Sequence, residues 1–538
     1  MQTKGIRIAI LGLIICFQAY SLSAQIPDEI APFKTPFGEF NFERPHFQDK
    51  AVSIVDYGAV EGGKTINTKS INTAIQELAK AGGGRVIVPP GKWLTGPIVL
   101  LSNINLHLEE GAELLFSQNF SDYLPAVLTN WEGSEVYTYS PFIYAFKQEN
   151  IAITGKGVLN GQGKPWWEHR KKGGFARSSA RLKEMNSNQV PVKERVFDNL
   201  EEFLPPVFFG PLYCKNILVE GVTFRYGAFW TINPNFCENI IVRGIYVLTN
   251  GDYGDAPNGD GINPNSCQNV LIEYNTLDTG DDCITIKSGR DRDGRRIGMP
   301  SKNILIRYNK GLQGHGGIVI GSEMSGGVEN VYAHDCRFNG TDRVIRIKTQ
   351  RGRGGYVRNC WFKNITADTI LQEAIRINML YSGSRLPAEG VSEDTPYIEN
   401  INYENIRCDY SERNVIQIIG IPEMPVRNIS FTDIELGGNK GIEITDAKDI
   451  TFNNISVSNT KGPFAEVKFS NNIVFDNVTV VKTDENTTPF VFEDVTDATL
   501  TRLKATMKDQ LILITGKSRN IKTDDSVKER QIKSATSG

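Results

Sequence analysis

A short phrase recurs along most of this chain: an asparagine followed by alternating apolar residues. From Asn216 to Asn330, successive copies lie 23, 30, 34 and 27 residues apart. Alternation with a period of two predicts short strands, and the Gly, Asn and Asp residues between the copies predict turns. Helical periodicity is nearly absent. The copies are NIAI (Asn150), NILV (Asn216), NIIV (Asn239), NVLI (Asn269), NILI (Asn303), NVYA (Asn330), NINY (Asn400), NISF (Asn428) and NIVF (Asn472), with DITF (Asp449) as a variant.

This repeat constrains the fold more than any other feature. Several short strands in each repeat of 21 to 34 residues predict an all-β fold, a right-handed parallel β-helix. In that fold each coil stacks on the last, about 4.8 Å away. A solenoid can accommodate 538 residues without dividing into several domains. We expect the repeated asparagines to form an internal ladder that satisfies turn amides between coils.

The first 24 residues predict a secretory signal peptide. Lys4 and Arg7 precede an apolar run, and Ser23 and Ala24 offer a small-residue cleavage site. A lipoprotein anchor at Cys16 is disfavoured because the preceding residue, Ile15, is bulky. No later segment has 18 uninterrupted apolar residues, so we expect no membrane span. The mature chain is therefore expected to be exported, either periplasmic or secreted.

A solenoid needs caps at its ends. TKSINTAIQELAKAGGG (68–84) predicts an N-terminal helical cap, because Ile71, Ala74, Ile75 and Leu78 share one helical face and glycines follow. The remaining expected segments are an N-terminal extension (25–50), the β-helix catalytic domain (51–517), a charged surface insertion near one mouth of the groove (168–205) and a loose polar tail (518–538).

Charge and cysteine content exclude some classes of function. The formal net charge is −3, which argues against a broad basic surface for nucleic acid or a membrane. Removal of the signal leaves seven of the eight cysteines, and an odd number at wide spacing does not indicate a disulfide framework. Because several cysteines recur at one place in the repeat, as in CKNILV, CENIIV and CQNVLI, we interpret them as buried and stacked.

Four successive coils align on two columns of aliphatic residues. Ile262, Ile284, Ile318 and Ile345 share the first column, which should face the core. The second column continues the same pattern two residues later. The aligned segments are NGDGINPNS (258–266), GDDCITIKS (280–288), GHGGIVIGS (314–322) and TDRVIRIKT (341–349), and the second column is Pro264, Ile286, Ile320 and Ile347.

The outward positions of these coils gather six ionisable groups on one predicted patch. Gly316 and Gly321 remove side chains nearby and leave room for a ligand. Strand alternation would turn Asp282 inward, where a bare carboxylate is costly. We therefore expect Gly280, Asp281 and Asp282 to form a bend before the strand. The six groups are Asp260, Asp281, Asp282, His315, Arg346 and Lys348.

Three crowded carboxyl groups suit glycosidic bond cleavage. One must protonate the leaving oxygen, and crowding raises the pKa of an acid. Asp281 is the expected general acid, with Asp260 and Asp282 holding the attacking water, and His315 orienting Asp281. With water as the nucleophile, the acid and base usually stand about 6.5–9.5 Å apart.

Arg346 and Lys348 then require an anionic partner, and a uronic acid carboxylate fits both. Lys287 aligns with Lys348 and is interpreted as structural or peripheral. Trp230, one coil before Asp260, either stacks on a sugar or packs. Trp166 and Trp167 are expected to pack.

The motifs N-G-D, T-G-D-D, G-H-G and R-I-K, in this order, resemble the four signatures of the polygalacturonase family, glycoside hydrolase family 28. The resemblance covers roughly residues 51–500 and implies the pectin-lyase-like β-helix fold. It implies Asp281 as acid, Asp260 with Asp282 as base, inversion at the anomeric carbon, and no metal or other cofactor.

The resemblance also implies substrate contacts. Arg346 and Lys348 would bind a galacturonate carboxylate, Tyr381 would touch the substrate, and Asn258 would shape the site. One departure is Gly259, where threonine is common in the family; we expect little effect. The phrase GHGGIVIGSEMSGG resembles bacterial, exo-acting members of the family. The 168–205 insertion, which would close one end of the groove, also favours exo attack.

The expected function is therefore a monomeric, exo-acting polygalacturonase on pectin or pectic oligosaccharides. Three alternatives stay open. They are a rhamnogalacturonan galacturonohydrolase, a pectate-type lyase, which would want calcium and a basic proton abstractor, and a catalytically silent glycan-binding β-helix.

Overall fold

The computed structural model describes residues 26–251, 256–381, 383–482, 487–505 and 510–535. The predicted signal peptide lies outside the described residues. Within them, no helix is both long and apolar enough to cross a membrane. The α-helices are α1 (Thr68–Lys80), α2 (Lys164–Arg170), α3 (Gly174–Ser187) and α4 (Asp291–Ile297).

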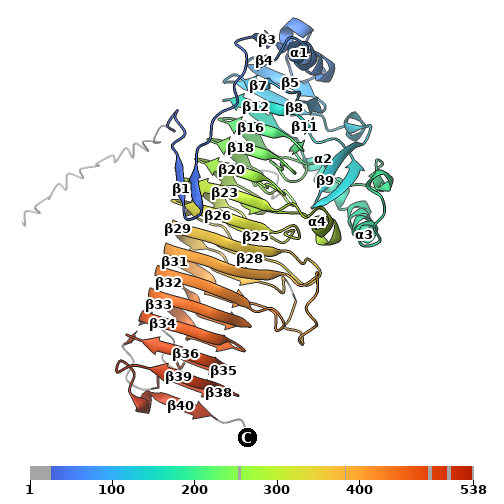
Figure 1. The fold of residues 1–538 in the computed structure, drawn as a ribbon. Coiled ribbons are helices and arrows are strands. Elements are labelled where there is room, and N and C mark those ends of the chain that lie inside the picture. Colours follow the sequence, from blue (N-terminus) through green and yellow to red (C-terminus); the bar gives the residue numbers. More distant parts are fainter. Residues whose placement is uncertain (1–25, 252–255, 382, 483–486, 506–509, 536–538) are drawn as a thin grey trace, which may run out of the picture.

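The strands stack coil on coil into a right-handed parallel β-helix, which confirms the predicted fold (Figure 1). Three parallel sheets run the length of the solenoid. The asparagine sheet contains β3 (Ala51–Ser53), β4 (Gly84–Val88), β7 (Ile104–Leu108), β12 (Glu149–Gly155), β16 (Lys215–Glu220), β18 (Glu238–Arg243), β20 (Gln268–Glu273), β23 (Ser301–Arg307), β26 (Val328–His334), β34 (Asn471–Lys482), β36 (Thr496–Thr501) and β39 (Arg519–Thr523).

The other two sheets complete each coil. The second sheet contains β5 (Gly91–Thr95), β8 (Ala112–Phe116), β13 (Val158–Asn160), β17 (Thr223–Arg225), β19 (Tyr246–Leu248), β21 (Thr276–Asp278), β24 (Lys310–Gln313), β27 (Arg337–Phe338) and β37 (Lys504–Ala505). The site sheet contains β6 (Ile98–Val99), β11 (Ile143–Phe146), β15 (Phe209–Leu212), β22 (Ile284–Ile286), β25 (Ile318–Gly321), β28 (Ile345–Lys348), β30 (Ile375–Asn378), β35 (Phe490–Glu493), β38 (Ile512–Thr515) and β40 (Ile532–Ala535).

Among the described strands, five long ones pass through more than one sheet without a break. They are β29 (Tyr356–Ile370), β31 (Tyr397–Ile419), β32 (Val426–Thr445), β33 (Ala447–Lys468) and β34, which pairs with both β36 and β37.

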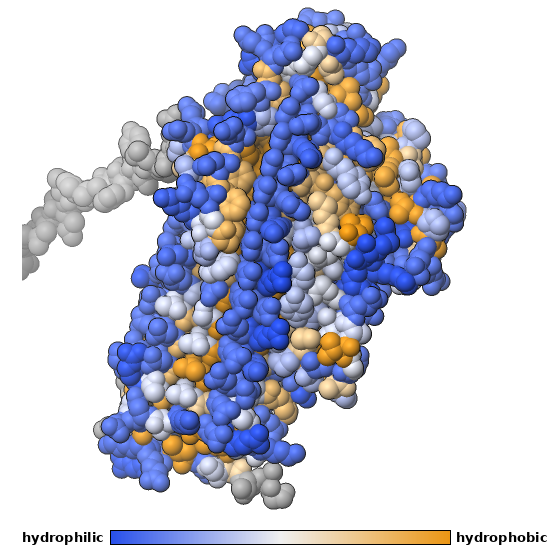
Figure 2. Space-filling model, viewed as in Figure 1, coloured by the Kyte–Doolittle hydropathy of each residue, from blue (hydrophilic) through white to orange (hydrophobic). Residues whose placement is uncertain are grey.

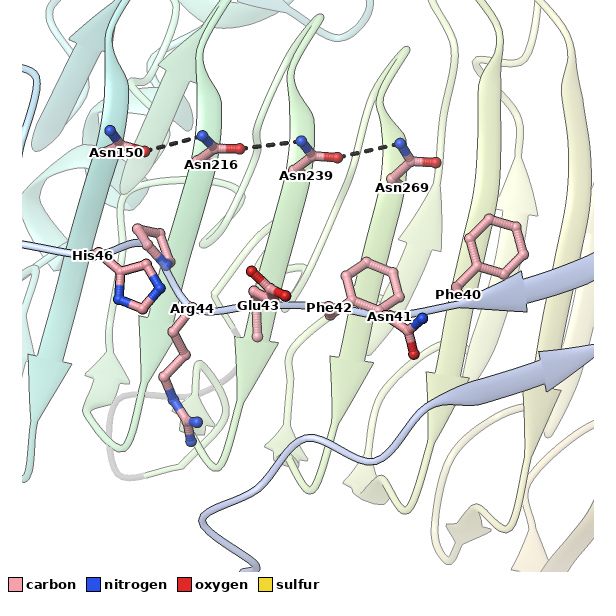
Figure 3. A pocket seen from close by; sticks show the side chains of 12 residues that line it. Phe40, Asn41, Phe42, Glu43, Arg44, His46, Asn150, Asn216, Asn239 and Asn269 are labelled. Atoms are coloured by element: carbon pink, nitrogen blue, oxygen red, sulfur yellow. Dashed lines mark hydrogen bonds between the residues drawn. The ribbon is translucent and has the colours of Figure 1, made fainter.

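The repeated asparagines hold the turn into the asparagine sheet. Asn216 and Asn239 have φ of 53° and 56°, in the left-handed region that asparagine tolerates better than most residues. Asn216 Nδ2 donates to Asn150 Oδ1 (3.0 Å), Asn239 Nδ2 to Asn216 Oδ1 (3.1 Å), and Asn269 Nδ2 to Asn239 Oδ1 (3.2 Å) (Figure 3). The predicted ladder thus exists, but it joins side chain to side chain on the surface, so its internal placement was wrong.

A different pair of asparagines satisfies buried turn amides. Asn275 Oδ1 accepts from the backbone N–H of Ile245 (3.1 Å), and Asn309 Oδ1 accepts from that of Asn275 (3.0 Å). Both side chains are buried. They escape the phrase pattern because no alternating apolar strand follows them.

The predicted core columns are confirmed. Ile284 pairs with Ile262 on one side and with Ile318 on the other, and Ile318 pairs with Ile345. All four are essentially inaccessible to solvent. The seven described cysteines are also buried and unpaired, in agreement with their interpretation as core residues.

The N-terminal end is capped as predicted. Helix α1 buries Ile71, Ala74, Ile75 and Leu78 against the first coils. Before it, the extension forms a small hairpin, β1 (Phe33–Thr35) with β2 (Gly38–Phe40), which lies along the outside of the asparagine sheet (Figure 1).

The C-terminal end differs from the prediction. Residues expected to form a loose tail instead form β39 and β40, which pair in parallel with β36 and β38. The segment is mostly polar, but Val527 is buried, and Ile521 and Ile532 pack partly buried against the core.

The 168–205 insertion contains the end of α2 and all of α3 and β14 (Val196–Phe197). Its strand β14 pairs with β10 (Ser134–Thr138) of a hairpin whose other strand is β9 (Val127–Trp131). These elements gather with α4 on one side of the solenoid (Figure 1). In the same view, hydrophilic side chains run lengthwise down the face in a column, with apolar side chains exposed on either side (Figure 2).

Candidate active site

All eight sequence-predicted site residues line one pocket of about 620 Å³ on the site sheet, at the coils of β22, β25 and β28. They are Asn258, Asp260, Asp281, Asp282, His315, Arg346, Lys348 and Tyr381.

A bend before β22 places the two adjacent aspartates in the pocket. The chain bends at Gly280, Asp281 and Cys283, and the strand begins only at Ile284. The backbone N–H of Asp282 donates to Asp281 Oδ1 (2.9 Å), while Cys283 turns into the core. The bend therefore reverses the alternation, as predicted, and both carboxylates face the groove.

The three aspartates form one compact cluster. Carboxylate oxygens of Asp260, Asp281 and Asp282 lie within 4.8 Å of one another. Asp281 is 19% exposed, whereas Asp260 and Asp282 are buried. Only Asp281 is therefore open to a group arriving from the groove.

One buried carboxyl of the cluster, that of Asp260, favours its protonated form. Burial, and then the neighbouring charge of Asp281, raises the pKa of Asp260 well above its usual value. Asp260 Oδ2 accepts from Asn263 Nδ2 (2.9 Å), and Oδ1 has no hydrogen-bond partner in the described part of the chain. The burial of Asp260 therefore adds to the effect that we expect from crowding among these carboxyls.

Two buried lysines hold the other charges. Lys348 Nζ lies 2.7 Å from Asp282 Oδ2, and Lys287 Nζ lies 3.9 Å from Asp260 Oδ2 and 3.0 Å from Glu323 Oε2. Burial alone would raise the pKa of Asp282, but Lys348 and other cations outweigh it and lower that pKa to about 2. Asp282 is therefore ionised at every physiological pH.

Gly321 makes this arrangement possible. It occupies the coil between Lys287 and Lys348, so no side chain blocks the reach of Lys348 across two coils to Asp282. Its φ is +94°, and a Cβ there would lie 2.1 Å from the carbonyl oxygen of Lys348. Lys287, interpreted from the sequence as structural or peripheral, lines the pocket instead.

His315 bears directly on Asp281. Its Nδ1 lies 3.0 Å from Asp281 Oδ1, as expected from their stacked positions. This hydrogen bond is the main cause that raises the pKa of His315 to about 9, against a smaller opposing effect of burial. At neutral pH the ring is therefore a cation that orients Asp281.

Arg346 differs from Lys348 in having no internal partner. Its Cα pairs with Val319 on the coil before, and its side chain lines the pocket. In the described residues it makes no hydrogen bond or ion pair, while Lys348 is already paired with Asp282. Of the two predicted carboxylate-binding residues, Arg346 is the one free to bind an external anion.

A wall closes the pocket on the side of the insertion. The tip of the β9–β10 hairpin docks on the segment after β22, where the backbone N–H of Arg290 donates to the carbonyl of Gly133 (3.0 Å) and its guanidinium pairs with Glu132. From α2, Arg170 Nη1 donates to Asn258 Oδ1 (2.6 Å). The insertion therefore reaches the site, together with a hairpin that no motif indicated.

The three tryptophans considered in the sequence analysis have different surroundings. Trp230 lines the pocket but is only 3% exposed, and Lys287 Nζ lies 4.4 Å from its ring centroid. Its contact is therefore with a buried cation beneath the pocket floor. Trp166 and Trp167 are buried packing residues, as predicted.

Sequence reasoning missed Glu132, Arg290 and Glu323. Glu323 follows β25 by two residues, after the chain leaves the strand, so alternation could not place it. Glu132 comes from a hairpin more than a hundred residues before the aligned coils. The glutamate in GSEMSGG was the one available signal, because it directly follows an aligned segment.

The three aspartates could also surround a cation. Here, however, Lys348 and Lys287 already supply two positive charges to the cluster. A divalent ion would have to displace Lys348 from Asp282 or share a crowded cationic site with it, so the donor set fits a metal-independent reaction better.

Comparison with known proteins agrees with the geometry. The family model described as glycosyl hydrolases family 28 matches residues 198–446. A "Probable polygalacturonase" of Vitis vinifera is 32% identical over 72% of this chain and 74% of its own length. An "Exo-poly-alpha-D-galacturonosidase" of Dickeya chrysanthemi is 25% identical over 80% of this chain and 75% of its own.

A solved structure extends the similarity to the fold. The crystal structure of a hyperthermoactive exopolygalacturonase from Thermotoga maritima is 37% identical, with a TM-score of 0.66 over 82% of this chain and 94% of that one. The repeat, the four motifs and these matches agree, and the chain is a glycoside hydrolase that belongs to glycosyl hydrolase family 28.

Proposed function

We propose that this protein hydrolyses galacturonic acid linkages in pectin or pectic oligosaccharides, removing units from chain ends. The observation that carries the proposal is the three-aspartate cluster beside the unpaired Arg346. The carboxyls supply acid and base, and the guanidinium offers a bidentate partner for a uronate carboxylate. The names of the relatives support the same substrate class.

Each aspartate has a proposed role. Asp281, the exposed carboxyl, protonates the glycosidic oxygen as the bond from that oxygen to the anomeric carbon breaks. Asp260 and Asp282 hold a water whose oxygen forms the new bond to the same carbon, and the water's proton passes to this pair. Between turnovers the cluster shares its proton over less than 4.8 Å, which lets Asp260 reload Asp281.

The expected stereochemistry is inversion. The oxygens of the cluster lie closer together than the about 6.5–9.5 Å usual between opposed carboxyls, so the sequence-based expectation of a wide gap is not met. Inversion here requires the water to sit beside the sugar between Asp260 and Asp282. Proton NMR of the first product tests this: the inverted anomer should appear first, and a retained anomer would contradict it.

Attack from a chain end follows from the closed wall. Glu132, Arg290 and the α2 contact to Asn258 form the pocket wall on the side of the insertion. We expect this wall to block one end of a polymer chain and to leave the later coils for the rest of the substrate. Digestion of oligogalacturonides should therefore release one small product from the start. A ladder of intermediate lengths at early times would show internal cleavage instead.

The same digest separates the other candidates. Pectic side-chain fragments cleaved in preference to oligogalacturonides would indicate the rhamnogalacturonan substrate. An unsaturated product absorbing in the ultraviolet, or loss of activity with a chelator, would indicate a lyase. We further propose export, on the strength of the N-terminal segment, and cell fractionation of the tagged full chain tests it.

A further inference from the structure

The cationic surface does not end at the pocket. On the next coil, the Cα of Arg376 in β30 pairs directly with that of Arg346, so the two side chains stack along the groove. Gln417 follows on β31, and Glu443 on β32. Over four successive coils the strip thus changes from two arginines to a neutral and then an acidic residue.

Around Arg346 and Arg376, arginine side chains outnumber the carboxylates that pair with them. Glu373 alone is shared by three arginines: Arg343 Nε at 2.8 Å, Arg376 Nη1 at 3.3 Å and Arg413 Nη1 at 3.8 Å. With Arg346 the group holds four cations, and its second carboxylate is Asp342, 3.6 Å from Arg343.

Burial supports the same conclusion. The side chain of Arg376 is only 16% exposed, and its Nε has no hydrogen-bond partner in the described residues. Burial and then the neighbouring Arg346 lower the pKa of Arg343 to about 10. Buried guanidinium groups with too few carboxylates form a site that an incoming anion would stabilise.

We propose that Arg376, assisted by Arg413, binds a second uronate carboxylate on the leaving-group side, one coil beyond Arg346. This inference rests on the proposed function. Coils repeat about every 4.8 Å, which is comparable to the length of one sugar unit, so successive carboxylates can meet successive arginines. On the next coil stands Gln417, a neutral side chain whose Nε2 donates to Glu443 Oε2 (2.8 Å), so a third carboxylate meets no cation there. The preferred substrate therefore carries two consecutive free carboxylates beyond the scissile bond.

The test is an Arg376→Gln variant assayed on oligogalacturonides, starting from the shortest one that the wild type cleaves. For the wild type, kcat/KM should rise when the shortest substrate is lengthened by one galacturonate unit. Lengthening by a second unit should raise kcat/KM much less. The variant should lose about tenfold on the lengthened substrate, as expected for one charge-assisted contact, and change less than twofold on the shortest. The matched control is Arg407→Gln, at an exposed arginine in the part of β31 that belongs to the second sheet.

A second readout does not depend on turnover. In an Asp281→Asn background, calorimetric affinity for the lengthened oligomer should fall with Arg376→Gln, and methyl-esterified oligomers should show no such difference. If Arg376→Gln lowers kcat/KM equally on every substrate length, Arg376 only supports Glu373, and the subsite is overturned. If the variant loses no activity or affinity on any length, the subsite is also overturned. In both cases the proposed hydrolysis of galacturonides still stands. Absence of wild-type turnover on every galacturonide would instead overturn the proposed function.

Discussion

The coils that form the active site and the coils that follow them share one fold but differ in regularity. In the later coils β31, β32 and β33 run unbroken for 23, 20 and 22 residues. In the site coils β22, β25 and β28 have only three or four residues each. The long strands continue through left-handed bends at residues such as Asn428 and Asn454, whereas the bend at Gly280–Cys283 lies outside any strand and turns two adjacent carboxylates to one face. The site depends on interrupting the repeat.

The cores differ in the same way. In the later coils a continuous aromatic column fills the interior, with Phe431, Phe452 and Phe475 stacked at centroid distances of 4.7 and 4.8 Å. In the site coils the aliphatic columns lie beside buried charges such as Asp260, Lys287 and Glu323. We infer that apolar packing in the later coils stabilises the folded state, whereas burying charged side chains in the site coils destabilises it.

The largest expected effect is on activity alone. Asp281→Asn should reduce kcat by about a thousandfold, because an amide cannot protonate the leaving oxygen. Thermal unfolding should change little, since Asn keeps the shape and Asp281 is partly exposed. Asp409→Asn, at an exposed position of β31, is the matched control. Turnover by the Asp281→Asn enzyme at the wild-type rate would remove Asp281 from the mechanism.

The opposite pattern is expected from the later coils. Phe452→Ala should lower the free energy of unfolding by about 3–5 kcal/mol, because it removes a fully buried ring from the stack and leaves a cavity. Activity per folded molecule should stay unchanged. Denaturant titration measures the first quantity, and Tyr410→Ala, at an exposed tyrosine, is the control. A large fall in kcat with an intact fold would show that the two regions are coupled.

The two regions also differ in how far the sequence predicts them. The Ile262–Ile345 column and the six ionisable groups follow from aligning short segments, because coil stacking turns sequence register into spatial contact. The alignment does not predict which ion pairs form among these groups. Lys348 pairs with Asp282 only because its side chain can pass over Gly321. The wall at Glu132 depends on the path of a hairpin outside the repeat.

Charge pairing in the site coils gives the next prediction. Lys348→Met leaves Asp282 buried without its nearest cation, and we expect a loss of about 3 kcal/mol in unfolding free energy at neutral pH. In the wild type the pKa of Asp282 lies below its usual 3.8, at about 2, so its stabilising contribution is present above 3.8 and lost as pH falls through 2.

In the variant that loss should begin at higher pH. Both the acid limb of the activity profile and the acid unfolding midpoint should therefore move upward. Lys440→Met, at an exposed position of β32, should move neither. An unchanged acid limb in the Lys348→Met enzyme would mean that Lys348 does not set the ionisation of Asp282.

The smallest expected effect concerns a feature that both regions share, the asparagine ladder. Asn239, in the site coils, and Asn428, in the later coils, have φ of 56° and 54°. Alanine is strained in this left-handed region by about 1 kcal/mol, whereas glycine is not. Each Asn→Ala variant should therefore be less stable than the matching Asn→Gly variant by about that amount in denaturant titration. Because the turn is the same in both regions, the difference should be equal at the two positions. Equal stability of the Ala and Gly variants at both positions would mean that the left-handed turn carries no strain for alanine, and a difference at only one of them would mean that the turn is not equivalent in the two regions.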